Sequence, residues 1–225
     1  MDEFAKLFES YSGRDSIVRT TSYLSLYLST YTRGSLSKKL RLINKELSYC
    51  RLLMRLFDDF PMLRYTINYG LGSKEKNGLL RVLGIIKNLL DQLYYPIEHI
   101  ALAADHHFLK VDSGSFYTVG TVVWGLSCYV DMIRALIMMV ILQRQTKGLK
   151  NVVLHEKIVA MQLEYLLLGF KDAADLALAI SYLPYGSFLW AGRLSQRNVG
   201  LFGTISSLIG VVMLLRRLKN EKSTS

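Results

Sequence analysis

The sequence has little cysteine and little proline. Its 225 residues include two cysteines, Cys50 and Cys128, and three prolines. Two cysteines exclude a disulfide framework, and neither has a partner at the spacing of a metal site, so we expect no metal and a reducing, cytosolic environment. We also find no low-complexity tract and no internal repeat.

Sequence motifs that carry chemistry are absent as well. There is no glycine-rich nucleotide loop, no paired-cysteine site and no Gly-x-Ser-x-Gly elbow. His99 and His106 are seven residues apart, whereas helical metal sites space their histidines three or four apart, so we interpret them as polar residues near a helix end. The sequence therefore predicts a protein that is not an enzyme and binds no cofactor.

Known targeting signals are missing from both ends. Acidic residues near Met1 and the lack of an early apolar run fit neither a secretory signal peptide nor a transit peptide. The last residues, Lys222 to Ser225, do not form a Ser-Lys-Leu address. We expect membrane insertion to depend on internal segments.

What the sequence has is positive charge and apolar residues. The formal net charge is +10, and 51% of the residues are hydrophobic. Such a charge predicts an anionic partner, either nucleic acid or anionic lipid. Because the aromatic residues lie among aliphatic ones and not among basic ones, the sequence favours a membrane partner and no nucleic acid. A soluble nucleic-acid module remains an alternative.

Helical periodicity dominates the chain, so we predict an all-α integral membrane protein with amphipathic helices in its N-terminal half and two membrane-spanning helices. A cytosolic amphipathic region would cover residues 1–110. It contains a helix that begins after Gly13-Arg14-Asp15, a break at residues 33–35 with Ser35 or Ser37 as N-cap, and a helix over residues 79–104 that is broken or kinked at Tyr95-Pro96.

The segment from Leu36 to Phe57 has the strongest amphipathic pattern. Apolar residues repeat at steps of three and four and predict one face of a helix. Basic residues fall mostly on the opposite arc, against Glu46 alone. The predicted membrane-binding residues are Leu40, Ile43, Leu47, Met54 and Phe57 on the apolar face, with Lys38, Lys39, Arg41, Lys45, Arg51 and Arg55 on the basic arc. A helix packed on its neighbours, or a coiled-coil seam, would show the same pattern.

Residues 116–142 form a nearly continuous apolar block. At 1.5 Å per residue the block makes roughly 40 Å of helix, enough to cross a bilayer with tilt. Asp131 and Arg134 interrupt it three residues apart, so they share a face and can pair. A buried helix in a soluble core is the alternative.

A second block, residues 199–215, has no charged residue and is at the short end for a span. Two pairs of small residues four apart, Gly203 with Ser207 and Ser206 with Gly210, predict close packing against another helix. Residues 143–198 would connect the spans and contain an amphipathic helix with Asp172 and Asp175 on its polar face. Residues 216–225 would form a basic cytosolic tail.

Several short segments, in this order, resemble the peroxisomal membrane protein 11 (peroxin-11) family, and its gamma (C) branch most closely. They cover nearly the whole chain: residues 11–15 (YSGRD), 47–51 (LSYCR), 55–59 (RLFDD), 69–72 (YGLG), 91–96 (DQLYYP) with Glu98-His99, 189–193 (LWAGR) and 200–207 (GLFGTISS).

The resemblance implies a multi-pass peroxisomal membrane protein with both termini in the cytosol. It implies that the protein promotes membrane protrusion, elongation and fission, and associates with itself and with sister proteins. Contact with a tail-anchored fission adaptor and a dynamin-like GTPase is also implied. The 36–57 helix resembles the family's remodelling helix, which would lie among the lipid headgroups. The alternative function is a pore for small metabolites that uses Asp131 and Arg134.

Overall fold

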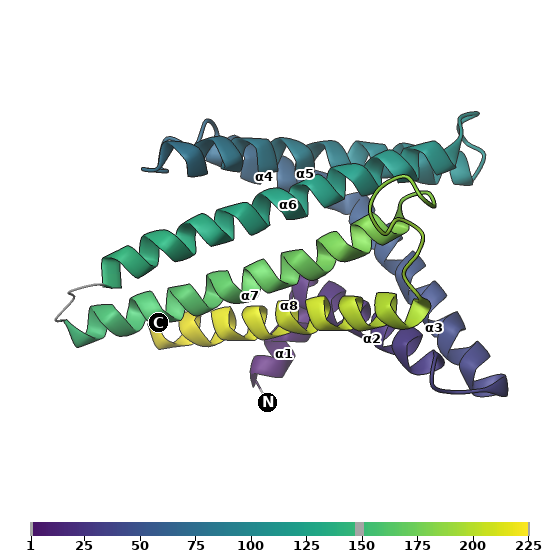
Figure 1. The fold of residues 1–225 in the computed structure, drawn as a ribbon, viewed down its shortest axis with the longest axis horizontal. Coiled ribbons are helices and arrows are strands. Elements are labelled where there is room, and N and C mark those ends of the chain that lie inside the picture. Colours follow the sequence, from purple (N-terminus) through teal and green to yellow (C-terminus); the bar gives the residue numbers. More distant parts are fainter. Residues whose placement is uncertain (1, 147–150, 225) are drawn as a thin grey trace. The chain divides into compact units, whose positions relative to one another are not determined.

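The computed structural model describes residues 2–146 and 151–224, and every regular element in these ranges is a helix. The predicted all-α class is therefore confirmed. Figure 1 shows the elements in chain order: α1 (Asp2–Glu9), α2 (Tyr11–Ser29), α3 (Gly34–Met54), the 3₁₀ helix η1 (Arg55–Phe57), α4 (Asp59–Tyr69), α5 (Gly78–Asp105), α6 (Ser113–Thr146), α7 (Val152–Tyr182) and α8 (Gln196–Thr224).

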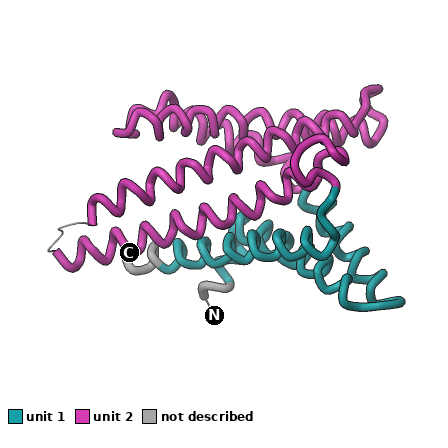
Figure 2. The backbone as a smooth tube through the Cα atoms, in the orientation of Figure 1, with its two compact units in different colours: residues 1–53, 193–225 teal, residues 54–192 magenta. Residues whose placement is uncertain are grey.

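The chain divides into two compact units, drawn in different colours in Figure 2. Unit 1 contains residues 1–53 and 193–225, and in it α2 packs along α8. Unit 2 contains residues 54–192, and in it α6 packs between α5 and α7. Both apolar blocks are helical, one in each unit.

Two helices are long and apolar enough to cross a membrane, as predicted. They cover Ser113–Thr146 and Gln196–Lys219. On α8 the side chains of Leu201, Ile205, Leu208 and Val212 recur every three or four residues and are all exposed. An apolar face of this kind is one that lipid would cover. The finer division of the chain into cytosolic, spanning and connecting segments stays a prediction, and its residues 147–150 and 225 lie outside the described ranges.

Two prolines lie inside helices, and one of them corrects an expectation. The helix α5 continues through Pro96, so the predicted break is absent. Proline has a helical φ and loses only one backbone donor, which packing on neighbouring helices compensates. Pro61 and Phe60 lie in the first turn of α4, where the missing N–H has no helical partner to lose. Pro61 therefore lies in the first turn of α4, shortly after the end of η1.

The start of α3 differs slightly from the prediction. Residues 31–33 do interrupt the helices, but α3 begins at Gly34, which has a φ of 67°. Neither Ser35 nor Ser37 is the N-cap. Instead, the Ser37 hydroxyl donates a hydrogen bond of 2.8 Å to the Ser29 carbonyl at the end of α2. This bond closes the turn between the two helices.

Candidate membrane interface

Polar contacts hold α3 against α2. The Arg51 guanidinium donates to both oxygens of Asp15, Nε to Oδ1 at 2.7 Å and Nη2 to Oδ2 at 3.1 Å. Ser22 lies about two turns after Asp15 on α2, with 2% of its surface exposed. Its hydroxyl contacts Asn44 Nδ2 at 2.9 Å and Ser48 Oγ at 2.9 Å. An ion pair and hydrogen bonds between polar side chains therefore hold α3 on α2.

Because α3 packs on α2, part of its predicted apolar stripe is half-buried and part is exposed. Leu40 and Leu47 are half-buried on the side of Asn44 and Arg51, and Met54 is also half-buried. No residue of α3 is fully buried. The exposed apolar side chains of the helix are Leu36 (54%), Leu42 (56%), Ile43 (42%), Tyr49 (39%) and Leu53 (39%), and Phe57 follows it at 78%. The free apolar face is therefore rotated toward Leu42 and Leu53 relative to the predicted one.

Four of the six predicted basic residues are exposed, and the other two form ion pairs within the protein. Lys38, Lys39, Arg41 and Lys45 are exposed, and within the described part of the chain they form no ion pair. Arg51 pairs with Asp15 and Arg55 with Glu98, so both are engaged inside the protein. Four cations and Glu46 remain at the surface of α3. The charge available to a membrane is thus +3, where the sequence predicted +5.

The Glu98 carboxylate accepts three hydrogen bonds in unit 2. Arg55 binds it through both nitrogens of its fork, with Nε 2.8 Å from Oε2, and the Tyr94 hydroxyl donates to Oε1 at 2.7 Å. The side chain of Glu98 is only 7% exposed. Next to it, His99 Nδ1 lies 3.2 Å from the Asp59 carboxylate. These contacts fix η1 and the start of α4 on α5. The pairs Arg55–Glu98 and Asp59–His99 could not be predicted from spacing, because their members are 43 and 40 residues apart.

The small residues of α8 pack against α2. A Cβ built on Gly200 would lie 2.7 Å from the backbone nitrogen of Tyr27, and one on Gly203 would lie 2.2 Å from the Tyr23 ring. Ser206 and Ser207 are buried on the same helix. Around Gly210 there is no atom within 4 Å of the same position. Of the predicted packing residues, Gly203 contacts α2, whereas Gly210 has no neighbour at the position of a Cβ. Gly200, which was not predicted, also packs against α2.

Asp131 and Arg134 belong to a larger charged network in unit 2. Arg134 Nη1 is 3.7 Å from Asp131, and Arg134 Nη2 is 3.7 Å from Glu75. Lys87 on α5 lies 3.2 Å from Asp131 and also pairs with Asp91, whose other oxygen accepts a bond from Ser127 at 2.6 Å. Each charge thus has an opposite partner, as burial in a spanning helix demands.

Asp112 marks the start of α6. Its carboxylate accepts hydrogen bonds from the backbone N–H of Ser115, at 2.8 Å, and from the Ser115 hydroxyl. These bonds favour the charged form and lower the pKa of Asp112 from its usual value. A capping carboxylate therefore fixes the beginning of the first apolar helix.

Comparison with known proteins identifies the family. The model of the peroxisomal biogenesis factor 11 family matches residues 1–215, which is almost the entire chain. The chain belongs to this family. The predicted resemblance is confirmed, and with it the all-α membrane-protein class.

Relatives in the family have similar length. Human peroxisomal membrane protein 11C is 38% identical over 98% of this chain and 97% of its own length. Mouse peroxisomal membrane protein 11C is 34% identical over all of this chain and 98% of its own length. No solved structure matches the chain. The arrangement of side chains described above therefore comes from this structure alone.

Proposed function

We propose that this protein acts in the peroxisomal membrane, where it promotes protrusion, elongation and fission without enzymatic chemistry. In this proposal α3 lies among the headgroups of the cytosolic leaflet and widens that leaflet. The observation that carries the proposal is the free surface of α3, on which four unpaired cations lie beside exposed Leu36, Leu42, Ile43 and Leu53. Membership in a peroxisomal biogenesis factor family supports the place and the process.

Charge and apolar area both contribute to binding. Near an anionic leaflet a basic residue contributes about 1 kcal/mol, so a net charge of +3 gives up to about 3 kcal/mol before salt screening. The four aliphatic side chains are roughly half exposed, and covering the exposed half adds about 1 kcal/mol each. The sum is enough for reversible surface binding by one helix. The spanning helices would hold it at the membrane in any case.

The remaining parts of the proposal follow the family resemblance. Both termini would lie on the same side of the membrane, since α6 and α8 provide two crossings, and the family resemblance implies that this side is the cytosol. Copies of this chain and of sister proteins would associate, and a tail-anchored adaptor with a dynamin-like GTPase would complete fission. A metabolite pore has less support, because Asp131 and Arg134, its predicted lining, are paired within the chain.

Proteoliposomes test the proposed role of α3. The full chain would be reconstituted into vesicles with and without phosphatidylserine, and membrane tubules would be counted by electron microscopy. We expect the variant with glutamine at Lys38, Lys39, Arg41 and Lys45 to lose most tubulation on anionic vesicles. A matched control replaces four exposed basic residues elsewhere, Arg64, Lys74, Lys76 and Lys110, with glutamine and should tubulate normally.

Two results would contradict the proposal. One is equal tubulation by the α3 variant and the wild-type chain. The other is an equal loss in the control, because total charge and not the α3 surface would then be responsible. Expression in cells provides a second readout, with the number and length of peroxisomes measured for the same two variants.

A further inference from the structure

A polar cavity lies inside unit 2, between α5, α6 and α7. Its volume is about 250 Å³, and its lining includes Lys87, Asp91 and Asp131 on one side and Lys171, Asp172 and Asp175 on the other. Within a bundle that contains an apolar spanning helix, a cavity with six charged side chains is costly to maintain. Such a cavity suggests a polar occupant.

The charges around this cavity do not balance. Lys87 pairs with Asp91 and Asp131, while Lys171 lies 2.8 Å from Asp172 and 3.2 Å from Asp175. Four carboxylates thus face two ammonium groups, a formal charge of −2. Arg134 and Glu75 add one charge of each sign and leave the difference unchanged. The lining therefore favours an additional cation.

One buried oxygen has no hydrogen-bond partner. Asp172 is 2% exposed, and its Oδ1 accepts the bond from Lys171. Its Oδ2 is buried and accepts no hydrogen bond from any residue that the structure describes. An unsatisfied carboxylate oxygen in such a place costs free energy unless a further group binds it. Asp172 and Asp175 lie on one polar face of α7 together with Lys171, as predicted, but this face is buried and lines the cavity.

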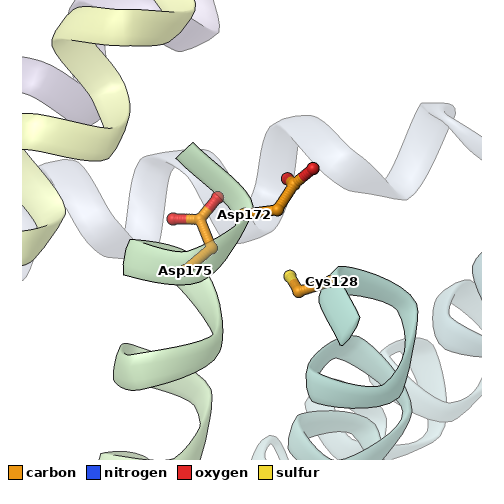
Figure 3. Close-up of side chains that lie close together, drawn as sticks. All are labelled: Cys128, Asp172 and Asp175. Atoms are coloured by element: carbon orange, nitrogen blue, oxygen red, sulfur yellow. The ribbon is translucent and has the colours of Figure 1, made fainter. Parts of the chain in front are cut away.

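Cys128 on α6 completes the set of donor atoms. Its side chain is directed toward α7, which carries both carboxylates, as Figure 3 shows. The thiol is buried, and its sulfur and one oxygen from each of Asp172 and Asp175 all lie within 4.8 Å of one another. Ligands of a tetrahedral zinc ion stand roughly 3.5 Å apart, so rotation of these side chains would close the site.

We propose that Cys128, Asp172 and Asp175 bind a divalent metal ion of the zinc class inside unit 2. On binding, the Cys128 thiol gives its proton to solvent and the thiolate joins two carboxylate oxygens as ligands. The Lys171 ammonium, which contacts both carboxylates in the metal-free arrangement, moves away from them. Lys171 stays in the lining of the cavity, so the metal adds two positive charges, the thiol loses one, and the formal charge of the lining changes from −2 to −1. This site is independent of the proposed action of α3.

Metal binding to the purified full-length chain tests the proposal. Zn²⁺ would be titrated calorimetrically into the protein in detergent micelles, and Co²⁺ would report a sulfur ligand through its thiolate charge-transfer absorption. We expect one ion per chain. Cys128→Ser should abolish the cobalt band, and Cys128→Ser and Asp172→Asn should each weaken Zn²⁺ binding at least tenfold. The matched control is Cys50→Ser, which changes the exposed cysteine and should leave both signals intact.

A lysine variant sharpens the test. Lys171→Gln removes the cation that competes with the metal, so we expect Zn²⁺ to bind at least tenfold more tightly to it. Absence of binding in both the wild-type chain and Lys171→Gln would overturn the proposal. Binding that survives Cys128→Ser and Asp172→Asn unchanged would overturn it too.

Alkylation provides a readout that needs no ligand variant. In the Cys50→Ser chain, Cys128 is the single remaining cysteine. We expect Zn²⁺ to slow its modification by a small thiol reagent at least fivefold, and Mg²⁺, which avoids thiolate ligands, to have no effect. An equal rate with and without Zn²⁺ would contradict the proposed sulfur ligand even if a ligand variant failed to fold.

Discussion

Asp15 and Arg51 form a two-pronged ion pair that holds α3 on α2, with distances of 2.7 and 3.1 Å. The pair limits how far α3 can move. A helix that enters a leaflet has to leave some of its protein contacts, so the strength of this pair opposes membrane insertion. Arg51 therefore stabilises the packed helix, although the sequence pattern assigned it to lipid.

The first prediction concerns this pair. In Asp15→Asn one charge of the pair is lost, which removes about 1–2 kcal/mol of contact energy for partly exposed groups. We expect the amides of α3 to exchange hydrogen faster and the chain to tubulate anionic vesicles more readily. Hydrogen exchange read by mass spectrometry measures the first effect. Glu46→Gln, which removes an exposed carboxylate of α3, should leave amide exchange in α3 unchanged.

The second prediction concerns Glu98. In Glu98→Gln, Arg55 and Tyr94 lose the carboxylate that accepts their hydrogen bonds, and the Arg55 charge stays in a mostly buried position. Removing one partner of a buried pair costs about 3–5 kcal/mol, and partial exposure of Arg55 lowers this to about 2–4 kcal/mol. We expect a lower Tm in detergent. Glu156→Gln, at an exposed position of α7, should leave Tm unchanged.

The third prediction compares glycines along α8. Gly200→Ala places a methyl group against the backbone of Tyr27, which cannot rotate away, so we expect a loss of about 1–3 kcal/mol. Gly203→Ala meets the Tyr23 ring, which can turn, and should cost less. Gly210→Ala meets no atom and gains helix propensity. Chemical denaturation in mild detergent would rank the three, and equal losses at Gly200 and Gly210 would contradict the packing described here.

The fourth prediction concerns pH. Because Ser115 stabilises the charged form of Asp112, the folded pKa lies below the ordinary value of 3.8. The stabilisation is therefore present above the unfolded pKa and disappears as pH falls through the folded pKa. Titration of the Asp112 carboxyl by NMR should give a value below 3.8, and Ser115→Ala should raise it. No change in Ser115→Ala would show that the hydroxyl bond has no effect.

The sequence was sufficient for most of the helices because their signals are local. Two expectations about helices were incomplete or wrong: α4 was not predicted, and α2 begins at Tyr11, with Ser10 as its N-cap, and not after Asp15. Apolar periodicity located α3, and two apolar blocks located α6 and α8. Each of these patterns lies within a few turns of chain. They depend on backbone geometry and hydrophobicity, which neighbouring residues determine.

Partner identity could not be predicted in the same way. A helical wheel treats Arg51 and Lys45 alike, but Asp15, which is 36 residues from Arg51 in the sequence, pairs with Arg51 and not with Lys45. A helical wheel also treats Leu40, Ile43 and Leu47 alike, but Leu40 and Leu47 are half-buried while Ile43 is exposed. Cys128 and Asp172 are 44 residues apart, so no spacing rule for metal ligands relates them. Long-range packing determined each of these assignments.

Unit 1 combines the first 53 residues with the last 33, and this has a consequence for biosynthesis. The glycine-rich face of α8 that packs on Tyr23 and Tyr27 leaves the ribosome only after all of unit 2 has been made. Newly made α2 must therefore wait, with the surface that packs on α8 uncovered, until α8 itself has been made. Loss of α8 through a premature stop codon would remove the helix on which α2 packs and would disturb the N-terminal part of unit 1, where Asp15 holds α3.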